Sequence, residues 1–327
     1  MTKYRKIFFI LVMSLLLLSS LPREVAGQQH QANRILVVDQ KGSGSFRTVQ
    51  SSIDAIPENN QQPTTIYIKK GVYQEKILLP KNKPYVSFIG EHQYETVLTY
   101  DDTNASSGST TNSSSTMIRA NDFYAENMTF QNTAGREAGQ AVALYVSGDR
   151  AIFKRVRVLG YQDTLYATGT GRQYYENCYI EGTVDFIFGS ATAVFKKAEI
   201  KSLGNGYITA ASTSETQKYG YVFIDSTLKK GTAGTQSVYL GRPWRPHSAV
   251  TFLHTKMEDH IKSVGWHNWN NPDNERTARY KEYGSTGAGS SVINRVKWSN
   301  ILTKNEANQI TVQAVLGGTD GWNPEKR

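Results

Sequence analysis

The sequence predicts an all-β fold in which the chain winds as a parallel β-helix, with a short helix capping its N-terminal end. From about residue 120, short segments rich in aromatic and β-branched residues repeat, separated by Gly, Asn and Asp. Period-2 alternation is common in these segments, whereas long amphipathic helical stretches are few. Similar residues also recur 22 positions apart, as Gln140 with Gln162 and Asp163 with Asp185. A stacked coil explains this offset because it places each pair on adjacent rungs, about 4.8 Å apart.

The repeating segments follow aromatic anchors that divide the chain into coils. The intervals between successive anchors are 29, 22, 20, 28 and 29 residues, for Tyr124, Phe153, Tyr175, Phe195, Phe223 and Phe252. The shortest intervals are close to 20 residues and the others are longer. This pattern suits a parallel β-helix, in which insertions loop out of one face and lengthen individual coils. A β-sandwich or propeller also has many short strands, but neither explains the matched offsets of Gln and Asp.

Residues 1–27 have the order of a secretory signal peptide. Basic residues precede an uncharged apolar run, Ile7–Leu18, and the segment ends in Val25-Ala26-Gly27. The run is short for a membrane span, and no stop-transfer pattern supports the alternative of an N-terminal anchor. Cleavage near Gly27 would leave residues 28–327 as a single β-helix domain, secreted and without a membrane segment.

The charge of the chain is strongly positive, at +9 for 327 residues. The predicted signal carries four basic residues and one acidic residue, so the remaining chain would keep about +6. A basic surface suits a polyanionic partner, although it is also compatible with solubility alone. Secretion and the lack of a recognised nucleic-acid motif disfavour nucleic acid. An acidic extracellular polysaccharide fits both charge and destination.

Three further segments and the single cysteine have predicted local structures. Phe46–Ile56 is amphipathic and is expected to cap the first coil, which covers unpaired strand edges. Asn305–Val315 is expected to form a helix packed on the flank. Thr103–Thr116, rich in Ser, Thr, Asn and Gly, is expected to be a surface loop. Cys178 is the only cysteine, so no intramolecular disulfide forms, and it is expected to be a small buried hydrophobe.

Three sequons are candidates for N-glycosylation in the secretory pathway. They lie at Asn104, Asn112 and Asn127. Asn127 falls in a predicted strand and is therefore the weakest of the three.

Five short motifs occur in a fixed order along the chain. They are Gly71-Val72-Tyr73-Gln74-Glu75, Gln140-Ala141-Val142-Ala143-Leu144, Gln162-Asp163-Thr164-Leu165, Asp185-Phe186-Ile187-Phe188-Gly189 and Leu240-Gly241-Arg242-Pro243-Trp244. Together they closely resemble the plant pectinesterase (pectin methylesterase) family, from about Ile35 to Trp322. One pentapeptide would be weak evidence, but five in order with the 22-residue offsets is a specific pattern. We expect the form of the family without an inhibitory pro-region.

The resemblance implies a right-handed parallel β-helix that hydrolyses methyl esters of galacturonate units in pectin. It implies Asp185 as the nucleophile and Asp163 as the acid that protonates departing methanol and then activates water. It further implies that the amides of Gln140 and Gln162 stabilise the oxyanion, and that Arg242 orients Asp185.

This chemistry is physically consistent. A guanidinium beside Asp185 would hold that carboxylate in place and keep it ionised. A close anionic neighbour would raise the pKa of Asp163, so that it keeps a proton at working pH. Amide donors aimed at the developing oxyanion contribute about 3 kcal/mol each in other enzymes. An isolated Asp in a β-helix more often caps a turn, so the hypothesis depends on the motifs together.

The resemblance also implies substrate contacts. Besides Gln140 and Arg242, they are Thr111, Tyr166, Phe188 and Trp244, whereas Tyr73 and Glu75 are expected to hold the N-terminal coils together. The chain departs from the family pattern at three places. Asn112 follows the Thr-Thr pair where an aromatic residue is usual, Gly139 stands where His is common, and Tyr145 stands where Arg is common. These changes remove no catalytic group but are expected to alter preference for substrate pattern.

No cofactor or metal is implied. The six histidines lack tight ligand spacing, and neither a Gly-x-Ser-x-Gly elbow nor a phosphate-binding loop occurs. The expected partners of the monomer are methylated homogalacturonan and a proteinaceous pectinesterase inhibitor. Two alternatives stay open: a pectin-binding cell-wall protein with weak turnover, and another β-helical pectin enzyme, a glycosidase or lyase.

Overall fold

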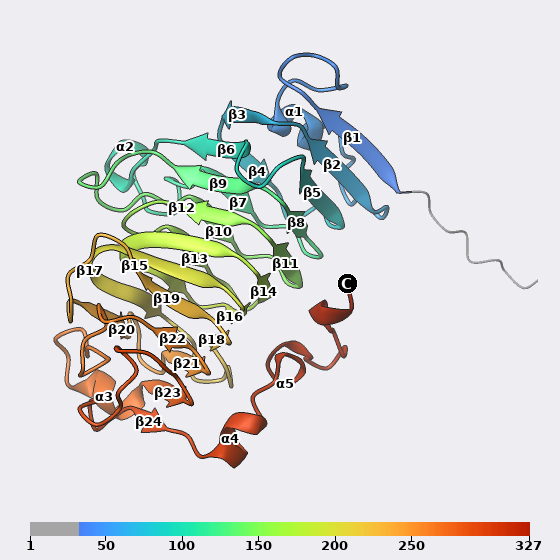
Figure 1. The fold of residues 1–327 in the computed structure, drawn as a ribbon. Coiled ribbons are helices and arrows are strands. Elements are labelled where there is room, and N and C mark those ends of the chain that lie inside the picture. The colour runs from blue at the N-terminus through green and yellow to red at the C-terminus, as the bar shows by residue number, and fades with distance from the viewer. Residues whose placement is uncertain (1–32) are drawn as a thin grey trace, which may run out of the picture. The chain divides into compact units, whose positions relative to one another are not determined.

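This computed structural model describes residues 33–327, which form parallel strands stacked rung upon rung (Figure 1). The first sheet has 11 strands, in spatial order β1 (Arg34–Val38), β2 (Thr64–Ile68), β5 (Val86–Gly90), β8 (Tyr124–Glu126), β11 (Ala151–Lys154), β14 (Arg172–Glu176), β16 (Thr192–Lys196), β18 (Tyr221–Ile224), β21 (Ala249–Leu253), β23 (Arg279–Tyr283) and β24 (Asn300–Ile301). The predicted signal peptide, residues 1–27, lies outside the described residues.

The second sheet bends to form two faces of the β-helix, and two long strands run through both of them. One face holds β3 (Gly71–Gln74), β6 (Thr96–Tyr100), β9 (Thr129–Asn132), β12 (Arg157–Leu159), β19 (Thr227–Lys230) and β22 (Lys256–Met257). The other holds β4 (Ile77–Leu79), β7 (Thr116–Ile118), β10 (Leu144–Val146), β13 (Leu165–Ala167) and β20 (Val238–Gly241). The joining strands are β15 (Tyr179–Gly189) and β17 (Glu199–Ala211). The predicted parallel β-helix is therefore confirmed.

Stacked aromatic rings fill the interior at the spacing of the rungs. Ring centroids are 4.7 Å apart for Phe153 and Tyr175, and 4.8, 4.6 and 4.5 Å apart along the continuing stack of Phe195, Phe223 and Phe252. The predicted anchor Tyr124 is wrong by one residue, because Ala125 is the residue paired with Phe153. Side chains alternate across a strand, so this slip puts Tyr124 on the opposite face. There it packs against the outer apolar cluster.

A short helix caps the first coil, as predicted. α1 (Val49–Asp54) buries Val49 and Ile53, and the Thr48 hydroxyl accepts a hydrogen bond from its first turn. The Glu75 carboxylate accepts hydrogen bonds from the backbone N–H groups of Val49, at 2.8 Å, and Gln50, at 2.9 Å. Glu75 therefore ties the cap to the second coil, and the structural role predicted for it is confirmed.

The C-terminal flank differs from the prediction of one helix over Asn305–Val315. Two short helices form instead, α4 (Lys304–Asn308) and α5 (Val312–Leu316). The chain breaks between them because the hydroxyl of Thr311 caps a new helix. Their apolar residues pack on outward-facing residues of the first sheet, such as Tyr174 and Val222. The remaining helices are α2 (Asn104–Ser107), α3 (Asp273–Thr277) and the 3₁₀-helix Pro324–Lys326.

The segment Thr103–Thr116 is only partly the surface loop that its composition predicts. Its first part contains α2, while residues 113–116 are buried and lead into β7. Asn127 lies in a turn between β8 and β9 with φ 61°, so its placement in a strand was wrong. Cys178 is buried as predicted, and burial raises the pKa of its thiol to about 12.

No helix within residues 33–327 combines the length and apolar character needed to cross a bilayer.

Candidate active site

The outer face of β10, β13, β15 and β17 supports a row of side chains at one level. Tyr145, Tyr166, Phe188 and Ala210 are successive register partners along this face. The 22-residue offset holds just before this row, since the N–H of Ala141 bonds to the carbonyl of Gln162 and that of Asp163 to the carbonyl of Val184. Gln140 is thus beside Gln162, and Asp163 beside Asp185.

The register changes by one residue immediately after the glutamine pair. The N–H groups of Ala143 and Leu144 both bond to the carbonyl of Thr164, so Leu144 pairs with Leu165 at an offset of 21. Such an irregularity locally re-aims side chains without breaking the ladder. It lies directly between Gln140 and the aromatic row.

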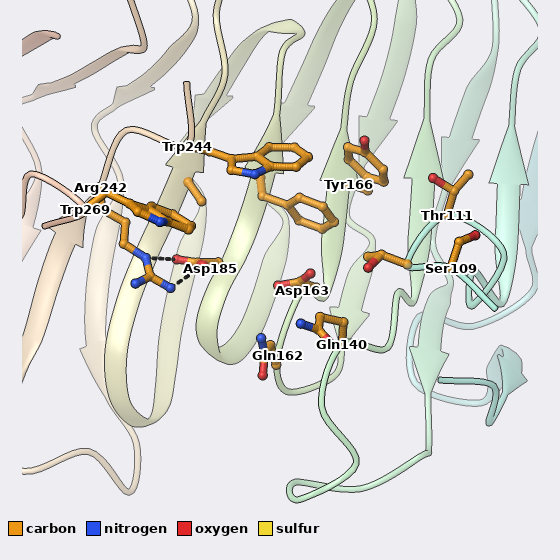
Figure 2. Close-up of a pocket in the computed structure, with 13 residues that line it drawn as sticks. Ser109, Thr111, Gln140, Gln162, Asp163, Tyr166, Asp185, Arg242, Trp244 and Trp269 are labelled. Atoms are coloured by element: carbon orange, nitrogen blue, oxygen red, sulfur yellow. Dashed lines mark hydrogen bonds and ion pairs between the residues drawn. The ribbon is translucent and has the colours of Figure 1, made fainter. Parts of the chain in front are cut away.

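The backbone at both aspartates is in the left-handed region. Asp163 has φ 64° and Asp185 φ 52°. Asp tolerates this region better than most residues, but strain of this kind persists only where surrounding structure holds it. Figure 2 shows both carboxylates facing one cleft, with Gln140 and Gln162 on one side and Tyr166 and Trp244 on the other.

The cleft has a volume of about 420 Å³. It collects every residue for which a catalytic or substrate-binding role is predicted: Thr111, Gln140, Gln162, Asp163, Tyr166, Asp185, Phe188, Arg242 and Trp244. Four lining residues were missed by the sequence analysis, namely Ser109, Thr110, Ala210 and Trp269. Trp269 lies in a loop without a motif, so no sequence signal marks it. Ala210 could have been found as the register partner of Phe188.

Arg242 binds Asp185 through two parallel hydrogen bonds. Its Nε donates to Oδ1 at 2.9 Å and its Nη2 to Oδ2 at 2.7 Å. The guanidinium is sandwiched between the rings of Tyr207 and Trp269, with its central carbon 3.8 Å from each ring centroid. This arrangement fixes the plane of the guanidinium, and hence the orientation of the carboxylate.

Burial is the first cause of the raised pKa of Asp163, which lies well above its ordinary value. The negative charge of Asp185 raises this pKa further, and Arg242 lowers it. The neighbouring charge was predicted from the sequence as the cause, whereas desolvation is the larger effect on the pKa of Asp163. Burial also raises the pKa of Asp185, against the hydrogen bonds and charge of Arg242. The pKa is raised further for Asp163 than for Asp185, and this difference favours Asp163 as the carboxyl that keeps a proton.

The two glutamine side chains supply amide groups at the cleft. Neither Gln140 nor Gln162 uses its side chain in a hydrogen bond to another described residue, so their N–H groups are available to a ligand. Across residues 33–327, no three His, Cys, Asp or Glu side chains group as a metal site would require.

The departures from the family pattern have defined places. Asn112 is exposed and lies outside the cleft, whereas Thr111 lines it. Tyr145 packs edge-on against Tyr166, with ring centroids 5.2 Å apart. Gly139 has φ 77°, a conformation that a histidine would adopt only with strain.

Comparisons with known proteins agree with this geometry. The family model described as Pectinesterase matches residues 35–319. Pectinesterase 31 of Arabidopsis thaliana is 41% identical over 285 residues, covering 84% of this chain and 89% of that protein. The structure of a pectin methylesterase from carrot is similar with a TM-score of 0.83 and 34% identity, covering 87% of this chain and 93% of that one. A pectin methylesterase in complex with a hexasaccharide is similar with a TM-score of 0.76 and 33% identity, covering 88% and 98%.

Proposed function

The chain belongs to the pectinesterase family, and from that membership we propose that it removes methyl esters from galacturonate units of cell-wall pectin, releasing methanol. The observation that carries the proposal is the pairing in one cleft of Asp185, held by Arg242, with Asp163, whose pKa is raised well above its ordinary value. One carboxyl is positioned as a nucleophile and the other holds a proton. Ester cleavage that does not use a metal needs both a nucleophile and a proton donor.

In the first step, a carboxylate oxygen of Asp185 attacks the ester carbonyl carbon. The carbonyl oxygen becomes an oxyanion, for which the side-chain amides of Gln140 and Gln162 are the donors at the cleft. As the bond to the methoxy oxygen breaks, Asp163 transfers its proton to that oxygen. Methanol leaves, and the galacturonyl group stays on Asp185 as an anhydride.

In the second step, the carboxylate of Asp163 takes a proton from water while the water oxygen attacks the acyl carbon. The bond to Asp185 breaks, which regenerates its carboxylate beside Arg242. The product is a galacturonic acid carboxyl, which ionises by losing its proton to solvent, and Asp163 is again protonated, so the two catalytic carboxyls return to their starting states.

The cleft walls suit an esterified sugar. Phe188, Ala210 and Val142 form an apolar cluster against which Tyr166 and Trp244 pack. Such a wall favours a neutral methyl ester and the apolar faces of sugar rings over an ionised carboxylate, which would lose its hydration there. Thr111 offers a hydroxyl at the edge of the same cleft.

The setting of the activity is part of the proposal. A chain secreted by its predicted signal peptide would act in the cell wall, as a monomer, on methylated homogalacturonan and under control of a proteinaceous inhibitor. Of the sequons, Asn112 is exposed and Asn104 half-buried. The side chain of Asn127 donates to the carbonyl of Gly90 at 2.9 Å, which disfavours a glycan there.

Methanol release from highly methylated pectin by the purified chain tests the proposal, with Asp185→Asn as the control. We expect release by the parent, none by the variant, and no fall in pectin viscosity. A fall in viscosity would indicate a glycosidase or lyase. Pectin binding without release of methanol by either protein would indicate a binding protein.

A further inference from the structure

A row of side chains leads out of the cleft toward the N-terminal coils. The rings of Phe188 and Tyr166 stack 4.1 Å apart, and Tyr145 follows on the next rung. The row continues to Met117 of β7, and the chain then reaches Arg119 just beyond the end of that strand. The guanidinium of Arg119 lies 5.9 Å from the ring centroid of Tyr145, so the aromatic row ends at a cation.

Two hollows meet at Arg119. The smaller, about 270 Å³, covers the outer side of β4 and β7 and is bordered by Asn112 and Ser114, in the segment whose preceding residues line the catalytic cleft. The larger, about 590 Å³, lies beyond the C-terminal ends of β4, β7, β10 and β13. Its lining is polar and includes Lys81, Arg119, Asn121, Ser147, Thr170 and Arg172.

The positive charge in the larger hollow is not neutralised locally. Lys81 and Arg119 are exposed, and neither forms an ion pair with another residue of the described range 33–327. The one carboxylate that lines it, Asp149, accepts hydrogen bonds from Arg172 at 2.9 and 2.7 Å and from Arg150 at 3.2 Å. Asp149 is thus occupied, and two cations remain for an anionic ligand.

Distance and chemistry connect this place to the substrate. Strand β7 is two rungs from β13, which corresponds to about 10 Å along the stack. Arg119 follows β7 whereas Asp163 precedes β13, so the two also differ by about five residues, or about 16 Å, along the strand direction, and they are roughly 20 Å apart. A polysaccharide bound in the cleft would extend over such a distance within a few sugar units. Its esterified units are neutral, whereas de-esterified units carry carboxylates that are ionised at neutral pH. Arginine is well suited to binding a carboxylate.

We propose that Arg119 and Lys81 form a second, anion-binding site that takes free carboxylates of a de-esterified galacturonate run while an esterified unit of the same polymer occupies the cleft. The inference rests on the proposed function for the identity of the polymer. The cleft then selects a neutral unit and the second site a charged one. De-esterification would therefore proceed next to units that are already de-esterified.

The test compares two charge-matched double variants. Lys81→Gln with Arg119→Gln removes the site, and Lys197→Gln with Lys201→Gln removes the same charge from the face that includes β12 and β19. Both pairs are at least partly exposed, so both variants are expected to fold, which the thermal midpoint checks. The probe for binding is a fully de-esterified oligogalacturonate, which contains no ester and so reports binding without turnover.

We expect the site variant to bind this oligomer about tenfold more weakly at low salt, with the control variant within about threefold of the parent. Added salt should reduce the difference in oligomer affinity between the site variant and the parent. Methanol release from a short, fully methylated oligomer should be unchanged in both variants. Release from partially de-esterified pectin should fall about tenfold in the site variant alone.

Equal weakening in both double variants would overturn the site and indicate general surface attraction. No weakening in either would also overturn it. A parent chain that releases no methanol from any substrate would refute the proposed function, but a selective loss of oligogalacturonate binding in the site variant would still support the anion site. The two failures are therefore distinguishable.

Discussion

Two arginine–carboxylate pairs in this molecule share the same bidentate chemistry but have opposite surroundings. Arg295 donates to Glu282 through Nε at 2.9 Å and Nη2 at 3.1 Å, with only 2% and 1% of the two side chains exposed. The other N–H groups of Arg295 reach backbone carbonyls, including those of Ser263 and Gly289, and Glu282 also accepts from the indole of Trp266. The buried polar groups of both side chains therefore have hydrogen-bond partners. Because these partners come from several different coils, the pair holds the last coils together.

The pair in the cleft leaves its carboxylate open. Asp185 accepts from Arg242 alone among the described side chains, and 9% of its side chain is exposed. Arg242 is flanked by ring faces instead of carbonyls, which orient it without competing for Asp185. The comparison shows that one ion pair has its hydrogen-bonding groups occupied, whereas the other leaves lone pairs of its carboxylate directed at a cleft, as the nucleophilic role proposed for Asp185 requires.

The largest expected effect is on activity. Asp185→Asn removes the proposed nucleophile and should lower kcat/KM for methanol release by about 10³-fold or more, as loss of a covalent nucleophile does elsewhere. Glu282→Gln, assayed per folded molecule, should keep activity near that of the parent. Near-full activity in Asp185→Asn, or an equal loss in both variants, would break the proposed contrast between the two pairs.

The next effect is on stability, and it should fall on the other pair. Glu282→Gln leaves Arg295 buried without its counter-charge, which should lower the free energy of unfolding by about 3–5 kcal/mol. Urea unfolding followed by tryptophan fluorescence measures this. Asp185→Asn serves as the matched control and should cost less, because Arg242 is less buried and keeps both ring contacts. Equal costs would show that the cleft pair is structural as well.

A smaller effect concerns the pH dependence of stability and arises from Asp163, which is buried and has no guanidinium partner. Its pKa is raised in the folded protein, so the native state binds the proton more tightly than the unfolded chain does. Stability is therefore retained below the unfolded pKa of about 3.9 and declines as pH rises from there through the raised pKa. Asp163→Asn does not titrate and tolerates the positive φ, so it should escape this decline.

Thermal midpoints across pH check this expectation. The midpoint of Asp163→Asn should match that of the parent at the acid end and exceed it increasingly at higher pH, while methanol release is lost. A variant less stable than the parent at neutral pH would contradict burial as the main cause of the shift.

The features of the fold that could be predicted are those that depend on local sequence. The 22-residue offset of the Asp and Gln pairs is visible in sequence because each rung repeats a similar path, and the predicted β-helix is confirmed by the strand register. The face taken by a side chain depends on where each turn places the next strand. That placement is not local, and it produced the one-residue error at Tyr124. The break of the C-terminal helix was missed for a local reason instead, because the hydroxyl of Thr311 caps α5 and so divides the predicted helix.

The candidate site divides in the same way. Residues within motifs, including Asp163, Asp185 and Arg242, were predicted to meet and do line one cleft, while their catalytic roles stay predictions. Tyr207 and Trp269 were missed because they reach Arg242 from separate coils, and no motif contains either residue. What surrounds a motif is determined by tertiary contacts, and in this cleft those contacts orient the guanidinium.

The smallest expected effect tests that orientation. Tyr207→Leu removes one ring from Arg242 but leaves both hydrogen bonds to Asp185 possible, a loss of about 1 kcal/mol, or about fivefold in kcat. KM should stay constant, because Tyr207 does not line the cleft. A less firmly held guanidinium stabilises the ionised Asp185 less, so its pKa rises and the acid limb of the pH–rate profile moves to higher pH. Tyr207→Phe keeps the ring and should match the parent in both respects. If the Leu and Phe variants behave alike, stacking does not position Arg242, and the reactivity of the cleft pair would depend on the hydrogen bonds alone.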